Sequence, residues 1–335
     1  RNLLNPESTK REVYPDKIVD SICPFCGVGC QTSVHLVGEN IVKVDGRQGP
    51  ANRGKLCVKG RFGMDYVMSP ERLTKPLIRR ESANKEPGMQ IGFKDINHYF
   101  REATWEEALE YAALGFDKLL KQKGGGSLCG FGSAKGTNEE AYLFQKFVRQ
   151  AFGTNNVDHC TRLCHASSVA ALMEGIGSGA VSAPFTAADD SDCIIVIGAR
   201  PEQNHPVAAT YLKQAAKSGA KLLVLDVRKQ GLMRHASHPV VFRSGCDVAL
   251  LNSMLHVIIN EKLFDEQYIQ ANVDGFDSLK KKVKDFSPEN MEDISGVSAS
   301  YVREISRVYA TSERSIIFWG MGVSQHVHGT DNARC

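Results

Sequence analysis

The sequence predicts an α/β protein in which a small β-rich module precedes doubly wound α/β domains. The first 75 residues are rich in cysteine, glycine and β-branched residues, whereas the later chain alternates strand-length apolar runs with helical patterns. Residues 192–227 have the pattern strand, helix, strand, which is the crossover unit of parallel sheets. With 335 residues, 42% of them hydrophobic, the chain can bury a sizeable core divided between two or three domains.

The predicted module, residues 1–75, contains a β-hairpin. Polar and apolar residues alternate over 32–37 and again over 41–44, on either side of a Gly-Glu-Asn turn. Pro70 and Pro76 then interrupt the chain. We therefore expect the module to end near residue 75.

Residues 76–155 form the second predicted segment, an α/β domain. Thr104 stands where it can cap a helix over 105–123, and a run of three glycines ends that helix. A short strand over 127–131 and a helix over 138–152 complete an α/β unit.

Residues 156–335 are predicted to form a Rossmann-like α/β domain. A strand over 192–198, a helix over 206–217 that ends at Gly219, and a strand over 221–227 make the crossover unit. The alternation continues in four further elements, expected at 240–242, 248–261, 298–310 and 315–319.

Charge and hydropathy exclude two classes of partner. Lys plus Arg minus Asp plus Glu is 41 − 38 = +3, a balance that predicts no nucleic-acid partner. Apolar runs such as 193–198 and 222–225 are of strand length, far below the roughly 20 residues that span a bilayer. We expect no membrane span.

Four of the ten cysteines form a motif. Cys23, Cys26, Cys30 and Cys57 stand in the spacing C-x2-C-x3-C-x26-C. Four thiolates in one loop hold an iron-sulfur cluster or a structural zinc, and a disulfide arrangement is a third alternative. Zinc usually takes two separated pairs, whereas this compact, glycine-containing loop favours a 4Fe-4S cluster.

Two further sites stay open on the residues alone. Lys59 follows the last cysteine of the motif and is either a solvated lysine or a contact between the cluster and an anionic neighbour. Cys164 is followed directly by His165, which fits a buried thiol, a nucleophile with its base, or a metal ligand beside a proton acceptor. Adjacent residues on a helix do not face each other, which weakens the nucleophile interpretation.

Together these motifs resemble the molybdopterin-dependent oxidoreductases, and among them the catalytic subunits of metal-dependent formate dehydrogenases of the cytoplasmic, NAD-linked type. The matching stretches extend across nearly the whole chain: Cys23-Pro-Phe-Cys-Gly-Val-Gly-Cys30, Cys57-Val-Lys-Gly60, Gly136-Thr-Asn-Glu139, Arg162-Leu-Cys-His165, Asn204-His-Pro206 and Trp319-Gly-Met-Gly-Val-Ser-Gln325.

The resemblance implies a catalytic centre. Cys164 matches the ligand to molybdenum or tungsten, His165 the adjacent proton acceptor, and Lys59 the lysine between cluster and pterin. Formate would give up its hydrogen and two electrons beside a metal held by two pterin dithiolenes and Cys164, and leave as carbon dioxide. The electrons would pass through the 4Fe-4S cluster to a partner subunit that carries iron-sulfur, flavin or NAD. Cofactors of this type supply the chemistry, and the protein positions them.

The resemblance also implies a molybdopterin guanine dinucleotide site. Its pyrophosphates need backbone amides and its guanine needs a carboxylate, so loops after parallel strands are the expected place. The expected residues are Gly198, Arg200, Asn204, Asp226, Arg228, Gly245, Asp247, Gly322 and Gln325. The alternative for the glycines is an ordinary turn, and for the two aspartates an ordinary helix cap.

Two rival functions remain. A nitrate reductase of the same superfamily is one, although His165 favours formate. A non-catalytic iron-sulfur electron-transfer subunit is the other, and Cys164-His165 argues against it. The stretch Gly130-Phe-Gly-Ser-Ala-Lys-Gly136 is one residue out of step with the Rossmann fingerprint, so no nicotinamide site is expected in this chain.

The cysteines outside the two predicted metal sites indicate the cellular location, and the resemblance to the family indicates how much of the subunit the chain represents. The remaining five are expected to be reduced thiols, which favours a cytoplasmic setting: Cys129, Cys160, Cys193, Cys246 and Cys335. For this family the chain resembles the N-terminal portion of a longer subunit, in which residues 76–155 would begin a discontinuous domain.

Overall fold

The computed structural model describes residues 14–181 and 183–335, so the first 13 residues of the predicted module lie outside it. The chain forms two compact units. The first, which we call the sheet unit, contains the described residues up to Leu36, Val42–Arg61 and Thr161–Cys335. The second, the helical unit, contains Val37–Ile41 and Phe62–Cys160. This grouping leaves the predicted boundaries near 75 and 155 untested.

The β-rich module is a three-stranded sheet. Strands β1 (Lys17–Ile22), β2 (Gln31–Val37) and β3 (Asn40–Gly46) lie in that order, and β1 pairs antiparallel with β2. The expected hairpin is β2–β3. Buried Asn52 fixes the chain that returns from β3, because its amide donates to three backbone carbonyls and its Oδ1 accepts from the Gln31 amide at 3.0 Å.

The larger sheet is parallel and four-stranded, in the order β10-β9-β8-β11. Its strands are β8 (Cys193–Ile197), β9 (Lys221–Asp226), β10 (His238–Val241) and β11 (Ser315–Trp319). Every residue of β8 is buried. Apolar, β-branched runs of this kind are typical of strands covered on both faces.

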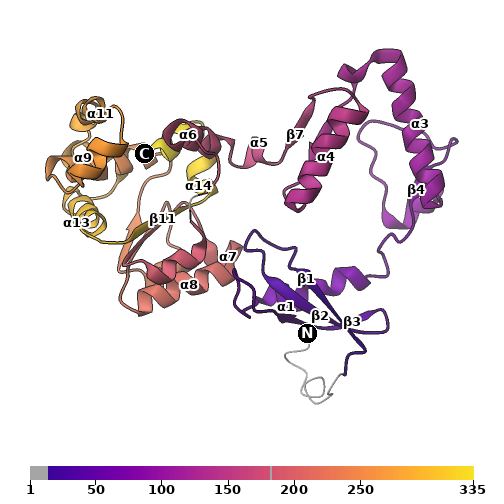
Figure 1. Cartoon of the computed structure of the whole chain (residues 1–335), viewed down its shortest axis with the longest axis horizontal. Coiled ribbons are helices and arrows are strands. Elements are labelled where there is room, and N and C mark those ends of the chain that lie inside the picture. Colours follow the sequence, from indigo (N-terminus) through magenta and orange to yellow (C-terminus); the bar gives the residue numbers. More distant parts are fainter. Residues whose placement is uncertain (1–13, 182) are drawn as a thin grey trace. The chain divides into compact units, whose positions relative to one another are not determined.

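Helices cover both faces, which confirms the doubly wound α/β prediction. Consecutive strand residues such as Ile194 and Ile195 point to opposite faces of the sheet and belong to two different cores. Helix α8 (Pro206–Lys217) packs in the first core, and α9 (Asp247–Asn260) with α13 (Ala299–Ala310) in the second. Figure 1 labels these three helices and the last strand of the sheet, β11, which belong to the same unit.

The cysteine module joins the first of these cores. Cys23 and Cys30 pack in the same apolar cluster as residues of α8. Tyr211 of α8 is 1% exposed, its hydroxyl donates to the Ala51 carbonyl at 3.1 Å, and the Lys55 ammonium lies 4.1 Å from its ring centroid. The cysteine loop and the parallel sheet are therefore packed together within the sheet unit.

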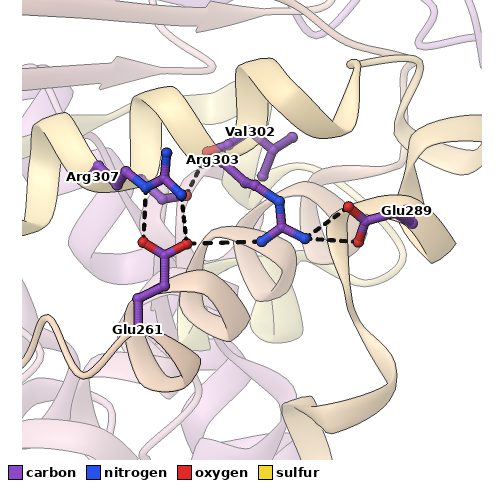
Figure 2. Close-up of polar contacts among 6 residues, drawn as sticks. Glu261, Glu289, Val302, Arg303 and Arg307 are labelled. Atoms are coloured by element: carbon purple, nitrogen blue, oxygen red, sulfur yellow. Dashed lines mark hydrogen bonds and ion pairs between the residues drawn. The ribbon is translucent and has the colours of Figure 1, made fainter.

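Shorter helices complete the sheet unit. They are α1 (Val58–Phe62), α5 (Thr161–Cys164), α6 (Ala166–Ile176), α7 (Pro201–Asn204), α10 (Glu266–Asn272), α11 (Phe276–Lys282), α12 (Pro288–Ser295), α14 (Met321–Ser324) and α15 (Gly329–Arg334). Four ion-paired side chains link α12, α13 and the residue after α9, as Figure 2 shows: Glu261, Glu289, Arg303 and Arg307.

The helical unit has a smaller core. Its longest helix, α3 (Trp105–Lys123), has the predicted bounds, and the Thr104 hydroxyl accepts from the Glu107 amide as expected of a cap. Besides short 3-10 helices, the unit contains β4 (Leu77–Arg79), α2 (Ile96–Tyr99), β5 (Phe100–Glu102), β6 (Gly130–Gly132), α4 (Asn138–Ala151) and β7 (Val157–His159). Within the described chain, no helix is both long and apolar enough to cross a membrane.

Candidate molybdopterin and iron-sulfur site

The four cysteines of the motif are brought to one loop region. Cys23 follows β1 directly, Cys26 and Cys30 precede β2, and Cys57 precedes α1. The Cys23 amide donates to the Cys30 carbonyl at 2.8 Å, which closes the loop. Gly29 has φ +66°, a left-handed conformation that glycine adopts at little cost.

The electrostatics of this loop fit a cationic cluster. Burial raises the pKa of Cys30 to about 12, and the neighbouring thiols Cys23, Cys26 and Cys57 add to the shift. Burial likewise raises the pKa of Cys23, while Lys59 lowers it. Four adjacent thiolates therefore need compensating positive charge, which iron ions bound by thiolates supply. Among the residues that the structure describes, no three or more His, Cys, Asp or Glu side chains are arranged so that they could hold a metal ion, so the four neighbouring thiols do not form a ready-made metal site.

Lys59 links this loop to the parallel-sheet region. It lies on α1, and its Nζ donates to the Gln203 carbonyl on α7 at 3.3 Å. Burial lowers the pKa of His205, and the nearby positive charge of Lys59 lowers it further. The lysine thus lies between the cysteine loop and a predicted dinucleotide loop, which is where its expected role requires it; the role itself stays a prediction.

Cys164 and His165 lie at a break between two helices. Cys164 is the last residue of α5, and His165, with φ −142° and ψ 27°, precedes α6. Both side chains are partly buried. The Cys164 thiol donates a weak hydrogen bond to the Met321 sulfur, with the two sulfurs 3.6 Å apart. Sequence reasoning missed Met321, although it lies within a motif that was recognised.

Two predicted dinucleotide residues, Gly198 and Gly322, lie where the strand order reverses. They follow β8 and β11, and a sheet of this type binds ligands at that point. The Gly322 amide donates to the Gly198 carbonyl at 2.9 Å, and a Cβ on Gly322 would lie 2.7 Å from the Gly198 Cα. Close backbone packing is therefore a structural reason for both glycines.

Arg200 and Asp226 are brought together at the end of β9. Their closest atoms, Arg200 Nε and Asp226 Oδ2, are 3.8 Å apart. Gln230, which sequence reasoning missed, donates its amide to Asp226 Oδ2 and to the Ala199 carbonyl, both at 2.8 Å. Burial raises the pKa of Asp226, and Arg200 opposes that shift.

Asp247 presents an unpartnered acceptor. It is the first residue of α9, is 2% exposed, and its Oδ2 accepts no hydrogen bond from the part of the chain that the structure describes. Burial raises its pKa. Gly245, two residues earlier, has φ +80°. A buried carboxylate with a free oxygen suits an N–H donor such as that of a guanine base, so these residues fit the expected dinucleotide.

The other three predicted dinucleotide residues do not lie beside another predicted residue as the six above do. Asn204 and Arg228 are exposed. Gln325 donates its amide to the Leu163 carbonyl at 3.3 Å, next to Cys164. The structure thus offers Gln325 a contact with the chain itself, and its dinucleotide role stays a prediction.

Comparison with known proteins identifies the family. The family model described as molybdopterin oxidoreductase matches residues 72–335, and the one described as molybdopterin oxidoreductase Fe4S4 domain matches residues 16–69. The chain belongs to the molybdopterin oxidoreductases. The match to the Fe4S4 domain covers all four cysteines of the motif, so this oxidoreductase chain contains the family's 4Fe-4S domain.

Curated relatives confirm the resemblance to formate dehydrogenase alpha subunits. The chain is 37% identical over 324 residues to formate dehydrogenase H of Escherichia coli (strain K12), covering 95% of this chain and 43% of the relative. It is also 37% identical over 316 residues to the F420-dependent formate dehydrogenase subunit alpha of Methanocaldococcus jannaschii, covering 94% and 44%. This oxidoreductase chain thus spans less than half the length of these relatives.

A solved structure confirms the fold. Acetylene hydratase from Pelobacter acetylenicus superposes with a TM-score of 0.79 at 23% identity, over 94% of this oxidoreductase chain and 42% of that one. At this identity the likeness supports the architecture alone, because one fold hosts different reactions.

Proposed function

We propose that this chain is part of a formate dehydrogenase that oxidises formate to carbon dioxide at a molybdenum or tungsten bis(molybdopterin guanine dinucleotide) centre, passing electrons through a 4Fe-4S cluster to a partner subunit. The observation that supports it most is the pair Cys164-His165, held at a helix break in the same compact unit as the four-cysteine loop. Relatives named as formate dehydrogenases support the substrate.

Each residue has a defined task in this proposal. When bound, the metal and its pterins supply the two-electron chemistry. Cys164 provides a thiolate ligand, and the His165 imidazole takes the proton released when the C–H bond of formate breaks, which leaves carbon dioxide and two electrons. Lys59 places an ammonium between the cysteine loop and α7. Asp247 accepts from the guanine, and Arg200 contacts a phosphate.

The partner is an iron-sulfur or flavin/NAD subunit, and the setting is cytoplasmic. Support for a reducing compartment comes from the cysteines, none of which forms a disulfide in the chain that the structure describes.

The decisive assay compares three reactions in the longest native form of the protein. We expect formate-dependent dye reduction, with iron and either molybdenum or tungsten bound. Nitrate-dependent dye oxidation would instead indicate a nitrate reductase, and acetylene hydration without dye turnover would indicate the chemistry named for the structural neighbour. Iron without molybdenum or tungsten would refute the catalytic proposal.

A matched pair of variants tests the ligand. Cys164→Ser should abolish formate oxidation and leave iron content and cluster absorbance unchanged, because Cys164 lies outside the four-cysteine loop. Cys160→Ser, an exposed cysteine four residues earlier, is the control and should keep full activity. Retained activity in Cys164→Ser would refute the role of Cys164 as ligand.

A further inference from the structure

Residues 319–325, which run from the last residue of β11 through α14 to Gln325, are hydrogen-bonded to the start of α6. Trp319 Nε1 donates to Ser168 Oγ at 3.0 Å, and Ser168 Oγ shares a hydrogen bond of 2.5 Å with Ser324 Oγ. The Ser167 hydroxyl donates to the Ser324 carbonyl, also at 2.5 Å. Ser168 and Ser324 are only 3% and 4% exposed. Buried hydroxyls are costly unless they are bonded, so this network defines one arrangement of the two segments.

The same segment also contacts α5, which ends in Cys164. Gln325 donates to the Leu163 carbonyl, and the Met321 sulfur lies 3.6 Å from the Cys164 sulfur. Residues 319–325 therefore contact the chain before, at and after the proposed metal ligand.

On its other side, the segment is anchored to the end of β8. The Gly320 amide donates to the Ile197 carbonyl at 3.1 Å, and Gly322 packs directly against Gly198. Asn332 of α15 donates to the Val323 carbonyl at 3.1 Å. Because these contacts are backbone to backbone or buried, the segment can transmit a fixed position from the sheet to Cys164.

Cys164 needs such support. Helix α5 has four residues and ends at the non-helical His165. One helical turn in isolation is unstable, since nucleation fixes several dihedrals for a single hydrogen bond. Its orientation must therefore come from tertiary contacts.

We propose that Ser324, through Ser168 and with Trp319, is a positioning residue that sets the direction of the Cys164 sulfur relative to the β8 end of the sheet. The proposal rests on the proposed function, in which Cys164 is the metal ligand. It assigns the polar network a role in geometry rather than in stability.

The two roles can be separated by mutation. Removing one hydroxyl leaves its partner hydroxyl unpaired. Removing both by substitution to alanine leaves only the N–H of the partly buried Trp319 without its acceptor, which costs less stability. A structural role predicts that the double variant Ser168→Ala/Ser324→Ala recovers both thermal stability and turnover. A positioning role predicts that it recovers stability but not turnover.

The experiment uses the metal-loaded enzyme in its longest native form. We expect Ser324→Ala, and the double variant, to lose about tenfold to a hundredfold in kcat for formate, the effect of a small misplacement of a catalytic group. KM, iron and molybdenum or tungsten contents should stay unchanged, and the paramagnetic resonance signal of the metal centre should shift. In metal-free protein, the amides of residues 161–176 should exchange faster in both variants.

Two further variants keep the test interpretable. Ser306→Ala is the matched control: Ser306 is fully buried on α13 and its hydroxyl donates to the Val302 carbonyl at 2.6 Å, so its loss should change kcat less than twofold. Trp319→Phe removes the N–H donor to Ser168 together with the five-membered ring that carries it, and keeps a six-membered aromatic ring. It should lower kcat and shift the resonance signal in the same direction as Ser324→Ala, but by less. This variant keeps the proposal testable if Ser324→Ala fails to fold.

The proposal is overturned if kcat and the resonance signal of these variants stay as in the parent enzyme, or if the double variant recovers turnover. Failure of the proposed function looks different, because the parent enzyme would then show no formate-dependent dye reduction or would bind iron without molybdenum or tungsten. If only the ligand role of Cys164 fails, Cys164→Ser retains formate oxidation whatever the serine variants do.

Discussion

The strand pair β8–β9 and the helix α3 show two ways in which one chain forms regular structure. In β9, Leu225 is 0% exposed and packs in a core that α9 and α13 share. In α3, no residue is buried, and Leu109 is 63% exposed. Local signals fix where both elements begin and end, but the strand lies within a buried core, whereas α3 touches the small core of its unit only through side chains such as Leu120 and Phe116 that are not fully buried.

The largest expected effect comes from a matched pair of leucine-to-alanine substitutions, one in each element. Leu225→Ala should lower the free energy of unfolding of the sheet unit by about 2–5 kcal/mol, because it removes apolar burial and leaves a cavity. Leu109→Ala should change stability by less than about 0.5 kcal/mol, as exposed substitutions do. Urea unfolding of the 335-residue chain, with hydrogen exchange to locate the change, measures both. A cost at Leu109 equal to that at Leu225 would contradict the comparison, since it would mean that α3 is packed against another part of the protein.

A smaller effect is expected at the cap of α3. The Thr104 hydroxyl accepts from the Glu107 amide at 3.2 Å, and a helix with no buried residues depends on such local terms. Thr104→Ala should cost about 1 kcal/mol, or roughly a fivefold loss of hydrogen-exchange protection in the first turn. Thr104→Ser retains the acceptor and should keep the protection. Equal hydrogen-exchange protection in Thr104→Ala and Thr104→Ser would show that packing, not capping, stabilises this turn.

The contrast between these regions also explains how much the sequence could predict. Elements with a strong pattern were predicted nearly to the residue, as with α3, α8 and β11. The short helices α10 and α12 were not predicted, because their ends depend on single side chains, the caps Asp265 and Ser287, rather than on a repeated apolar face.

The residues of the candidate site also differ in how well the sequence predicts them. The spacing of the cysteines predicted the four-cysteine loop, whereas Asp226 and Asp247 were expected from the resemblance to the family, and their dinucleotide roles stay predictions. The bonds of Asn52, Gln230 and Ser324 could not be predicted, because each joins segments that only the folded chain brings together. Long-range polar contacts of this kind leave no periodic signal in a sequence.

The smallest expected effect concerns the ion pairs on the exposed side of α13 (Figure 2). Arg307 donates two hydrogen bonds to Glu261, at 2.8 and 2.9 Å, and Arg303 donates two to Glu289, at 2.7 and 2.9 Å. Glu261→Gln should cost less than about 1 kcal/mol at pH 7, because partly exposed pairs are screened by water and salt. Glu289→Gln, at a more exposed carboxylate, is the matched comparison and should cost less still.

The pH dependence follows from the direction of the shift. Hydrogen bonds from Arg307 lower the pKa of Glu261. Because the folded-state pKa lies below the unfolded one, the contribution of Glu261 is complete above about pH 5 and is lost as the pH falls through the lowered pKa. The stability difference between the parent chain and Glu261→Gln, measured by urea unfolding, should therefore be present at pH 7 and shrink steadily below pH 5. A difference that persists undiminished in acid would mean that the glutamate acts by packing, as Leu225 does, so that the exposed side of α13 would belong with the core rather than with the solvated surface.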